Sequence, residues 1–248
     1  MAYRRPRAYV RVQGPDAADL LQRLLSNDVL AAESCDALLL TPKGRVIAPL
    51  LVWRRGEDDF LLLTEPELGE MVRAHLTRMR LTSRCEIELE QHTSTVVLGG
   101  SDGIATRDYG VPAVEVLDAD VESSPPDEEL ERLRILARTP RWGRELDGYV
   151  LPAEAGLDER AISFDKGCYP GQEPIARLHY RGHPNRGLRV LAVEGAAAGD
   201  EVRHAEKVVG RVTSVVSDLA LAYVRVEVPQ NTELTVGGKP ARLHSVAE

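Results

Sequence analysis

The densest group of chemically versatile side chains in this 248-residue sequence lies between Phe164 and Arg177. The stretch reads FDKGCYPGQEPIAR, and it combines a lysine, a cysteine, a glutamine, a glutamate and an arginine with two glycines and two prolines. Such polar density on an irregular backbone is more typical of a functional loop than of a core element. We therefore predict a site loop, and the alternative is a plain tight turn that leads into a helix starting near Gln172.

Cys168 is the candidate reactive group of this loop, because a cysteine thiolate is both a nucleophile and a metal ligand. Lys166 lies two residues away, and its ammonium would favour the thiolate if the two side chains converge. Cys168 and Lys166 are therefore the candidate catalytic residues. The alternative for Cys168 is a small buried filler, since free cysteines often pack in this way.

The remaining polar residues and glycines of the loop suit ligand binding. Glycine permits a positive φ or a close approach of a ligand to the backbone, and the glutamine, glutamate and arginine side chains offer donors, acceptors and a planar fork for a carboxylate. Two candidates lie outside the loop, one beside a hairpin turn and one a tryptophan whose default role is core packing. The candidate cofactor-binding residues are Gly167, Tyr169, Gly171, Gln172, Glu173, Arg177, Arg45 and Trp53.

Histidines and arginines follow the loop directly. His179 and His183 have the four-residue spacing that binds metals on a helix, but Gly182 and Pro184 argue against a continuous helix, so we favour a surface or structural role. A cationic wall is a second interpretation, which would meet the carboxylate tail of a ligand, a phosphate or an RNA, with a solvated rim as the alternative. Its members would be Arg177, Arg181, Arg186 and Arg189.

Periodicity predicts the elements that must position these residues. Apolar residues at helical spacing predict helices over 14–25, 66–79 and 125–137, and β-rich runs predict a hairpin over 37–53 and strands over 60–64, 87–89 and 95–98. Pro49 favours an edge strand or a bulge. The stretch near 112–126 is weakly patterned and acidic, so we expect a loop between subdomains.

The pattern of the last sixty residues differs from that of the rest of the chain and predicts a small barrel or sandwich. Short β-branched runs punctuated by turn residues cover 188–193, 208–216, 220–226, 234–236 and 241–246. Strands followed by helices without strict alternation give an α+β fold for the rest.

Composition limits the classes of function. The formal net charge is −8, which argues against a protein that coats nucleic acid, although a local arginine cluster leaves a contact with tRNA open. No apolar run approaches the ~18–20 residues that span a bilayer, so we expect no membrane partner. Three widely spaced cysteines indicate neither a disulfide framework nor a self-contained metal site, and predict a cytoplasmic location.

The loop sequence resembles a known family signature. Lys166 to Glu173 matches the K-G-C-[FY]-x-G-Q-E motif of the YgfZ family of folate-binding proteins, which is related to the glycine-cleavage T-protein, an aminomethyltransferase. Further segments resemble landmarks of the same family in the same order. They are 14–17 (GPDA), 40–45 (LTPKGR), 151–157 (LPAEAGL), 181–182 (RG) and 209–214 (VGRVTS).

This resemblance implies a fold and a role. The implied fold has three subdomains around a central hole, with two interwoven α+β subdomains over 1–185 and a small β-barrel over 186–248. The implied function is that of a tetrahydrofolate-binding accessory protein that supports the maturation or repair of iron–sulfur proteins. Cys168 would be its key thiol, and iron–sulfur assembly or client proteins its partners.

Two departures from the T-protein pattern disfavour glycine-cleavage aminomethyl transfer. The pterin-binding glutamate of T-proteins aligns with Leu136, which cannot accept hydrogen bonds. The catalytic aspartate should lie near Leu63 to Pro66, where we cannot place it. A non-enzymatic or weakly catalytic factor is therefore favoured, and the alternatives are a cysteine hydrolase, with His179 as the base for Cys168, and a scaffold that binds no folate.

Overall fold

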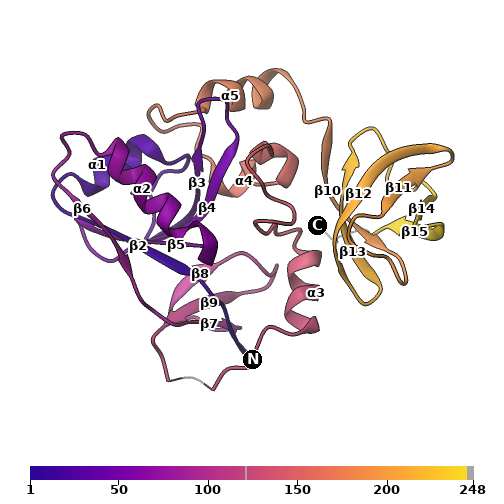
Figure 1. The fold of residues 1–248 in the computed structure, drawn as a ribbon, viewed down its shortest axis with the longest axis horizontal. Helices are drawn as coiled ribbons and strands as arrows, with labels where there is room; N and C mark the ends of the chain where they lie inside the picture. Colours follow the sequence, from indigo (N-terminus) through magenta and orange to yellow (C-terminus); the bar gives the residue numbers. More distant parts are fainter. Residues whose placement is uncertain (121, 245–248) are drawn as a thin grey trace.

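The computed structural model describes residues 1–120 and 122–244 as three β-sheet units around a common junction (Figure 1). A five-stranded sheet and a four-stranded sheet lie on one side of the junction, and a closed six-stranded barrel lies on the other. Short helices fill the space between them. The expected α+β fold with a C-terminal barrel is therefore confirmed.

The five-stranded sheet is covered on one face by two helices whose leucines fill its core. The helices are α1 (Ala17–Leu24) and α2 (Gly69–Met79), which follows the short 3-10 helix η1 (Pro66–Leu68), and they cover strands that are rich in leucine and valine. In spatial order the strands are β3 (Ser34–Leu40), β4 (Val46–Arg54), β5 (Asp59–Thr64), β2 (Ala8–Gln13) and β6 (Glu86–Glu90).

The sequence favoured an edge strand or a bulge at Pro49, and this residue lies in an interior strand close to a register shift. β4 pairs with β5 only from Leu51 onward, whereas Pro49 pairs with Leu38 of β3. At Pro49 the β5 side of β4 is therefore locally unpaired, so its missing N–H costs no hydrogen bond there. A register shift between Leu39 and Leu40, typical of a bulge, lies close by.

The four-stranded sheet draws its first strand from the N-terminus, so the two subdomains interweave. β1 enters this sheet while β2, only a few residues later, enters the other. Helix α3 (Glu128–Leu136) is capped at its N-terminus by Asp127, whose side chain accepts a hydrogen bond from the Leu130 backbone N–H at 3.0 Å. The spatial order of the strands is β1 (Ala2–Arg4), β7 (Ser94–Leu98), β9 (Ala113–Leu117) and β8 (Ile104–Thr106).

The expectation of a loop near 112–126 is wrong in its first part. β9 occupies 113–117 and pairs with both β7 and β8. Its acidic member, Glu115, is fully buried because Arg7 and Ser94 donate hydrogen bonds to it. A strand that buries a carboxylate against an arginine distant in sequence has no clear local hydrophobic pattern.

The barrel begins at Arg186 and closes through six antiparallel strands. Its own apolar cluster fills the interior, with residues such as Leu191, Val202 and Val236. The strands in order around the barrel are β10 (Arg186–Ala192), β13 (Leu219–Arg225), β12 (Lys207–Val216), β11 (Glu201–His204), β14 (Leu234–Val236) and β15 (Lys239–Leu243).

The segment between the sheets and the barrel carries the predicted site loop. It contains the short helices η2 (Pro152–Ala155) and α4 (Asp158–Ala161) and the longer α5 (Gln172–Arg181). α5 lies beside the turn of the β3–β4 hairpin, and α4 lies near the middle of the molecule (Figure 1). Among the described residues, no helix has the length and apolar character to cross a membrane.

Candidate functional site

Lys166 anchors the site loop to the end of helix α1. Its ammonium donates to the Leu25 carbonyl at 2.9 Å and to the Asn27 carbonyl at 2.7 Å. These carbonyls follow the C-terminus of α1, where a cation is favoured by the helix dipole. Burial lowers the pKa of Lys166 to about 8, against the opposing charges of Asp28 and Cys35.

Gly171 locks the other side of the loop onto the β3–β4 hairpin turn. Its φ is +85°, and a Cβ there would lie 2.5 Å from the Thr41 carbonyl oxygen, so only glycine fits. In return, Gly44 of the turn is buried, and a Cβ there would meet Pro174 and Ile175 at 3.2 Å. Two segments that look like separate landmarks in the sequence are therefore in close contact.

Cys168 is exposed between these two anchors. Tyr169, next to it, is buried in the apolar cluster that also contains Ile175 and Leu38. Lys166 points inward to its two carbonyls while the thiol faces outward, so the geometry supports a role for Lys166 as an anchor rather than the expected activation of the thiol. The loop therefore exposes one thiol on a backbone that is fixed on both sides by the contacts of Lys166 and Gly171.

Cys35 is the thiol whose ionisation Lys166 influences. It is half-buried, and burial, together with Asp36, raises its pKa to about 12 against the opposing charge of Lys166. A thiol in that state stays protonated and inert near neutral pH. Cys35 is thus a natural control for Cys168.

The other candidate binding residues of the loop lie at the start and on the outer face of α5. Gln172 is half-buried as the first residue of the helix, and Glu173 and Arg177 are exposed. Gly167 has open space around its Cα. Arg45 directly follows the hairpin turn, and its guanidinium donates to the Tyr149 carbonyl. It therefore borders the loop from the hairpin side.

Trp53 is separated from these residues. It lies at the end of the β3–β4 hairpin opposite the turn, where it pairs with Ser34. Its ring packs against the apolar cluster of Tyr9, Leu51 and Leu61. Core packing therefore accounts for Trp53, and the structure does not bring it to the loop.

The histidines after the loop have roles other than pairing with Cys168. α5 extends to Arg181, so the helix includes His179 and ends before His183. The His179 ring stacks on Phe164 with centroids 4.0 Å apart. Within the described ranges, no hydrogen bond joins Cys168 to a histidine, and no group of three or more His, Cys, Asp or Glu residues could hold a metal ion.

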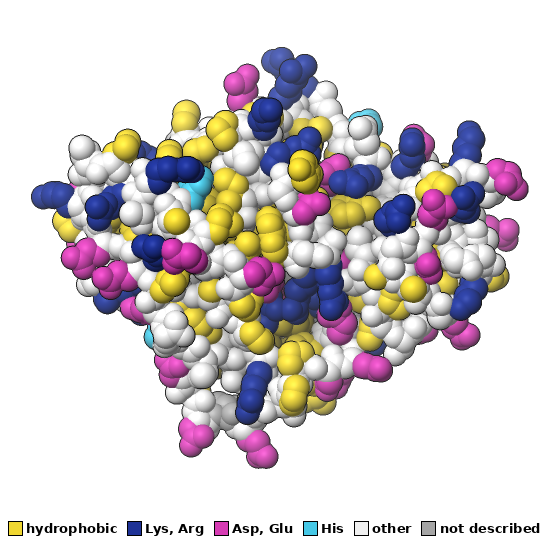
Figure 2. All heavy atoms as spheres, in the orientation of Figure 1, with side chains coloured by type: hydrophobic (Ala, Val, Ile, Leu, Met, Phe, Trp, Pro, Cys, Tyr) yellow, Lys and Arg dark blue, Asp and Glu magenta, His cyan; other side chains and the backbone are white. Residues whose placement is uncertain are grey.

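An open cleft of about 530 Å³ lies between the loop that follows β8, the end of α3, the helices η2 and α4, and the first strand of the barrel. Figure 2 shows Lys and Arg side chains gathered near the middle of the face that it draws. The basic residues that line the cleft include Arg107, Arg138 and Arg189. Burial lowers the pKa of Arg189, and the nearby charge of Arg138 lowers it further. We call this the outer cleft.

The sequence left a cationic wall and a solvated rim open for four arginines, and the structure does not bring the four together. Arg177 and Arg181 are exposed on α5, and Arg186 pairs with Glu154 at 3.0 Å and lies 4.5 Å from the centre of the Tyr223 ring. Of these four arginines, Arg189 alone is among the residues that line the outer cleft. Side chains close in sequence diverge here because the chain passes from α5 into the barrel.

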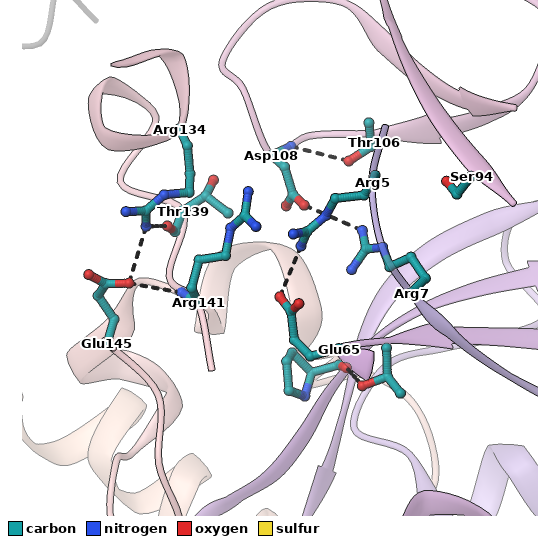
Figure 3. Close-up of polar contacts among 12 residues, drawn as sticks. Arg5, Arg7, Glu65, Ser94, Thr106, Asp108, Arg134, Thr139, Arg141 and Glu145 are labelled. Atoms are coloured by element: carbon teal, nitrogen blue, oxygen red, sulfur yellow. Dashed lines mark hydrogen bonds and ion pairs between the residues drawn. The ribbon is translucent and has the colours of Figure 1, made fainter. Parts of the chain in front are cut away.

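A network of buried ion pairs (Figure 3) surrounds a small cavity that shares Pro140 and Arg160 with the lining of the outer cleft. Arg5 donates to Glu65 at 2.9 Å, and Arg160 donates to Asp108 at 3.0 Å. Burial alone would raise the pKa of Asp108, but Arg160, Arg7 and Arg5 together lower it to about 2. Inside the network the space open to water is only about 40 Å³, well below the roughly 300–1,000 Å³ of a usual ligand pocket.

A second buried group, centred on Glu145, reaches the barrel (Figure 3). This carboxylate is fully buried, and it accepts from Arg134 at 3.1 Å and from Ser214 of β12 at 2.6 Å. Leu136, at the position of the T-protein glutamate, packs instead against the apolar cluster that contains Ile135 and Tyr169. The sequence analysis missed these charged residues, and its one available signal was an acidic residue, Glu115, inside an apolar run.

The fold of this protein belongs to the T-protein-like class of structures. The structure matches that of the glycine cleavage system aminomethyltransferase T from Bartonella henselae with a TM-score of 0.83 over 99% of this chain and 85% of that one, at 18% sequence identity. Residues 185–247 match the model of the CAF17 C-terminal β-barrel domain. The expected T-protein-like architecture is therefore confirmed.

Two sequence relatives are named as iron–sulfur cluster assembly factors. The chain is 26% identical to the protein named iron-sulfur cluster assembly factor IBA57 homolog, mitochondrial, of Neurospora crassa, over 77% of this chain and 53% of that one. It is also 26% identical to the human protein named iron-sulfur cluster assembly factor IBA57, mitochondrial, over 98% of this chain and 83% of the human one. The chain thus spans about half the length of the Neurospora relative.

Proposed function

We propose that this chain is an accessory factor for iron–sulfur cluster assembly or repair, of the YgfZ type, and that it works through Cys168. The observation that carries the proposal is the presentation of that thiol. Cys168 is exposed, whereas Lys166 on one side is bound to the end of α1 and Gly171 on the other is clamped against the hairpin turn. The names of the IBA57 relatives support the same process.

A single thiol requires a partner for this work. Iron–sulfur clusters are usually held by four protein ligands, and one exposed cysteine supplies one of them. We propose that Cys168 binds iron transiently together with ligands from a client or an assembly protein. Because the loop is held at both ends, little conformational entropy is lost when a partner docks. The cysteines are free thiols, which suits the cytoplasm that we propose as the location.

We further propose that tetrahydrofolate binds in the outer cleft. Its volume of about 530 Å³ is within the usual range for ligand pockets. Arg107, Arg138 and Arg189 would hold the carboxylates of the folate tail, and Asp158 and Glu159 would accept hydrogen bonds from the pterin. When bound, tetrahydrofolate supplies a carrier for one-carbon units, and the residues of the cleft bind and orient it.

Two enzymatic alternatives have less support. Aminomethyl transfer of the glycine-cleavage type lacks the pterin glutamate, because Leu136 packs into an apolar cluster. A cysteine hydrolase would need a histidine against the thiol, and His179 instead stacks on Phe164. The geometry therefore favours neither aminomethyl transfer nor hydrolysis at Cys168.

The activity of iron–sulfur enzymes in cells tests the assembly role. Deletion of the coding gene should lower the activity of a [4Fe–4S] dehydratase by at least fivefold while its protein level is kept, and the wild-type chain should restore it. An enzyme without a cluster, measured in the same extracts, is the control. Unchanged dehydratase activity after deletion, under both aerobic and iron-limited growth, would contradict the assignment.

A binding titration tests the folate proposal separately. Anaerobic calorimetry with tetrahydrofolate should give one site, and the double change Arg138→Met with Arg189→Met should weaken binding at least tenfold. Arg177→Met with Arg181→Met, at two exposed positions outside the cleft, is the matched control and should leave the affinity within twofold. Absence of binding at high micromolar tetrahydrofolate would leave the scaffold alternative.

A further inference from the structure

An apolar pocket of about 140 Å³ lies between helix α5 and the segment that contains η2 and α4. Helix α5 supplies Ile175, Leu178 and His179 to its lining, and Leu151 and Pro152 belong to the opposite side. We call this space the α5 pocket. An engineered cavity of about 150 Å³ holds one benzene molecule. The α5 pocket therefore has the size of a single six-membered ring.

Two aromatic side chains line the α5 pocket together. Phe164 and His179 stack with their ring centroids 4.0 Å apart and their planes 21° from parallel. Tyr180 packs edge-on against His179 with a centroid distance of 4.8 Å. His179 is exposed and Phe164 is half-buried, so the stacked pair reaches from the surface into the pocket. Because aromatic rings attract a further ring in stacked or edge-to-face geometry, the pocket suits a planar ring better than an aliphatic chain.

The α5 pocket and the outer cleft share part of their linings. Ala153 of η2 and Asp158, the first residue of α4, line both spaces. Asp158 is half-buried, and within the described ranges no ion pair or hydrogen bond occupies its carboxylate. A carboxylate can accept two hydrogen bonds from a ring that carries adjacent N–H donors. A ligand with such a ring and a polar tail can therefore use both spaces at once.

The cavity inside the ion-pair network is too small for a ring. It has only about 40 Å³, against about 140 Å³ for the α5 pocket. The carboxylates of Glu65 and Asp108 beside it are paired with arginines, and Leu136, at the T-protein glutamate position, packs into an apolar cluster. A ring with N–H donors therefore finds both room and a free acceptor at the α5 pocket.

We propose that the α5 pocket binds the pterin ring of the tetrahydrofolate whose tail lies in the outer cleft. This inference rests on the proposed folate binding and names the residues that select the ring. Asp158 would accept hydrogen bonds from the N–H donors of the ring, and the Phe164–His179 pair would contact it by stacking. Since Phe164 stands four positions before Cys168, the ring would also lie against the start of the site loop.

Anaerobic calorimetry on the full chain tests the inference with three probes. They are tetrahydrofolate, 6-methyltetrahydropterin as the ring alone, and 4-aminobenzoylglutamate as the tail alone. His179→Ala should weaken binding of the two ring-containing probes at least fivefold, because the ring loses a stacking partner, and should leave the affinity for the tail within twofold. His204→Ala, at an exposed position on β11 of the barrel, is the matched control and should leave all three affinities within twofold.

Asp158→Asn keeps the test valid if loss of the His179 ring disturbs the fold, because it removes a charge and keeps the size of the side chain. It should weaken binding of tetrahydrofolate and of 6-methyltetrahydropterin at least tenfold. Asp165→Asn is its control, because Asp165 is exposed and lines neither the α5 pocket nor the outer cleft. This control should keep both affinities within twofold.

The outcomes separate this inference from the folate proposal. Unchanged tetrahydrofolate affinity in both His179→Ala and Asp158→Asn, with weaker binding after Arg138→Met and Arg189→Met in the outer cleft, would overturn the inference and leave the folate proposal intact. Absence of binding by both tetrahydrofolate and 6-methyltetrahydropterin would overturn the two together.

Discussion

The site loop and the central ion-pair network hold their residues in opposite ways. The loop uses consecutive residues, fixed by backbone carbonyls and a glycine contact, and it turns its thiol outward. The network collects residues from Arg5 to Arg160 and buries their charges against one another. The loop is therefore arranged to meet a partner, and the network to hold three sheet units together.

The energetic consequences of this difference are also opposite. An exposed thiol contributes little to stability, so its replacement should affect function alone. Each buried ion pair, in contrast, has lost its hydration, and removal of one member leaves an uncompensated charge. Changes in the network should therefore appear first as loss of stability, and changes at the loop tip as loss of activity.

Arg134→Met should give the largest effect on stability. It leaves Glu145 fully buried without its arginine, and breaking such a pair costs about 3–5 kcal/mol. Urea unfolding monitored by circular dichroism measures the free energy of unfolding. Arg132→Met, on the same helix but with an exposed partner, Asp218, is the control and should cost at most about 1 kcal/mol. An equal loss of unfolding free energy in both variants would contradict the expected difference between a buried and an exposed ion pair.

Gly171→Ala should come next, and it tests whether the loop depends on its clamp. The new Cβ would lie 2.5 Å from the Thr41 carbonyl oxygen at a φ of +85°, and strain plus overlap should cost about 2–4 kcal/mol. Gly167→Ala is the matched control, since open space surrounds that position, and its cost should be within about 0.5 kcal/mol. If both variants unfold at the same urea concentration, the clamp has no energetic role.

Lys166→Met should give the smallest effect, and one that depends on pH. The pKa of Lys166 is about 8 in the folded chain against an ordinary value of 10.5, so between these values the unfolded chain binds more protons. The free energy of unfolding of the wild type should therefore rise with pH in this window, relative to the variant. After discounting for the half-exposed side chain, we expect a relative gain of about 1 kcal/mol from pH 7.5 to 9.5.

Urea unfolding of wild type and Lys166→Met at both pH values measures that gain. Taking the difference between the two proteins removes the titration of tyrosines and other cysteines. A difference that stays constant between pH 7.5 and 9.5 would show that burial does not perturb Lys166.

The sequence predicted the loop because its chemistry is contiguous. Lys166 to Glu173 stand together, and leucine spacing indicated the helices around them. The same reasoning could not foresee that Lys166 would reach Leu25 and Asn27, because that contact joins segments about 140 positions apart in the chain. The inward orientation of the lysine, away from Cys168, is a tertiary result.

The central network had almost no local signal. Arg5 and Arg7 read as part of a basic N-terminal stretch, and Glu115 interrupts an apolar run. Their partners are distant in sequence, and only the folded chain shows that the charges neutralise one another. Charged residues that become buried through distant partners are the ones that hydrophobic patterns misplace, as the strand at 113–117 shows.

The most direct test of the central claim compares two cysteines in cells that lack the chromosomal gene. Cys168→Ser and Cys35→Ser chains are expressed at equal levels, and the specific activity of a [4Fe–4S] dehydratase is measured against the wild-type chain. We predict that Cys168→Ser restores less than a tenth of the wild-type activity, whereas Cys35→Ser, which changes the half-buried thiol with its raised pKa, restores it fully. Full restoration by Cys168→Ser would contradict the account.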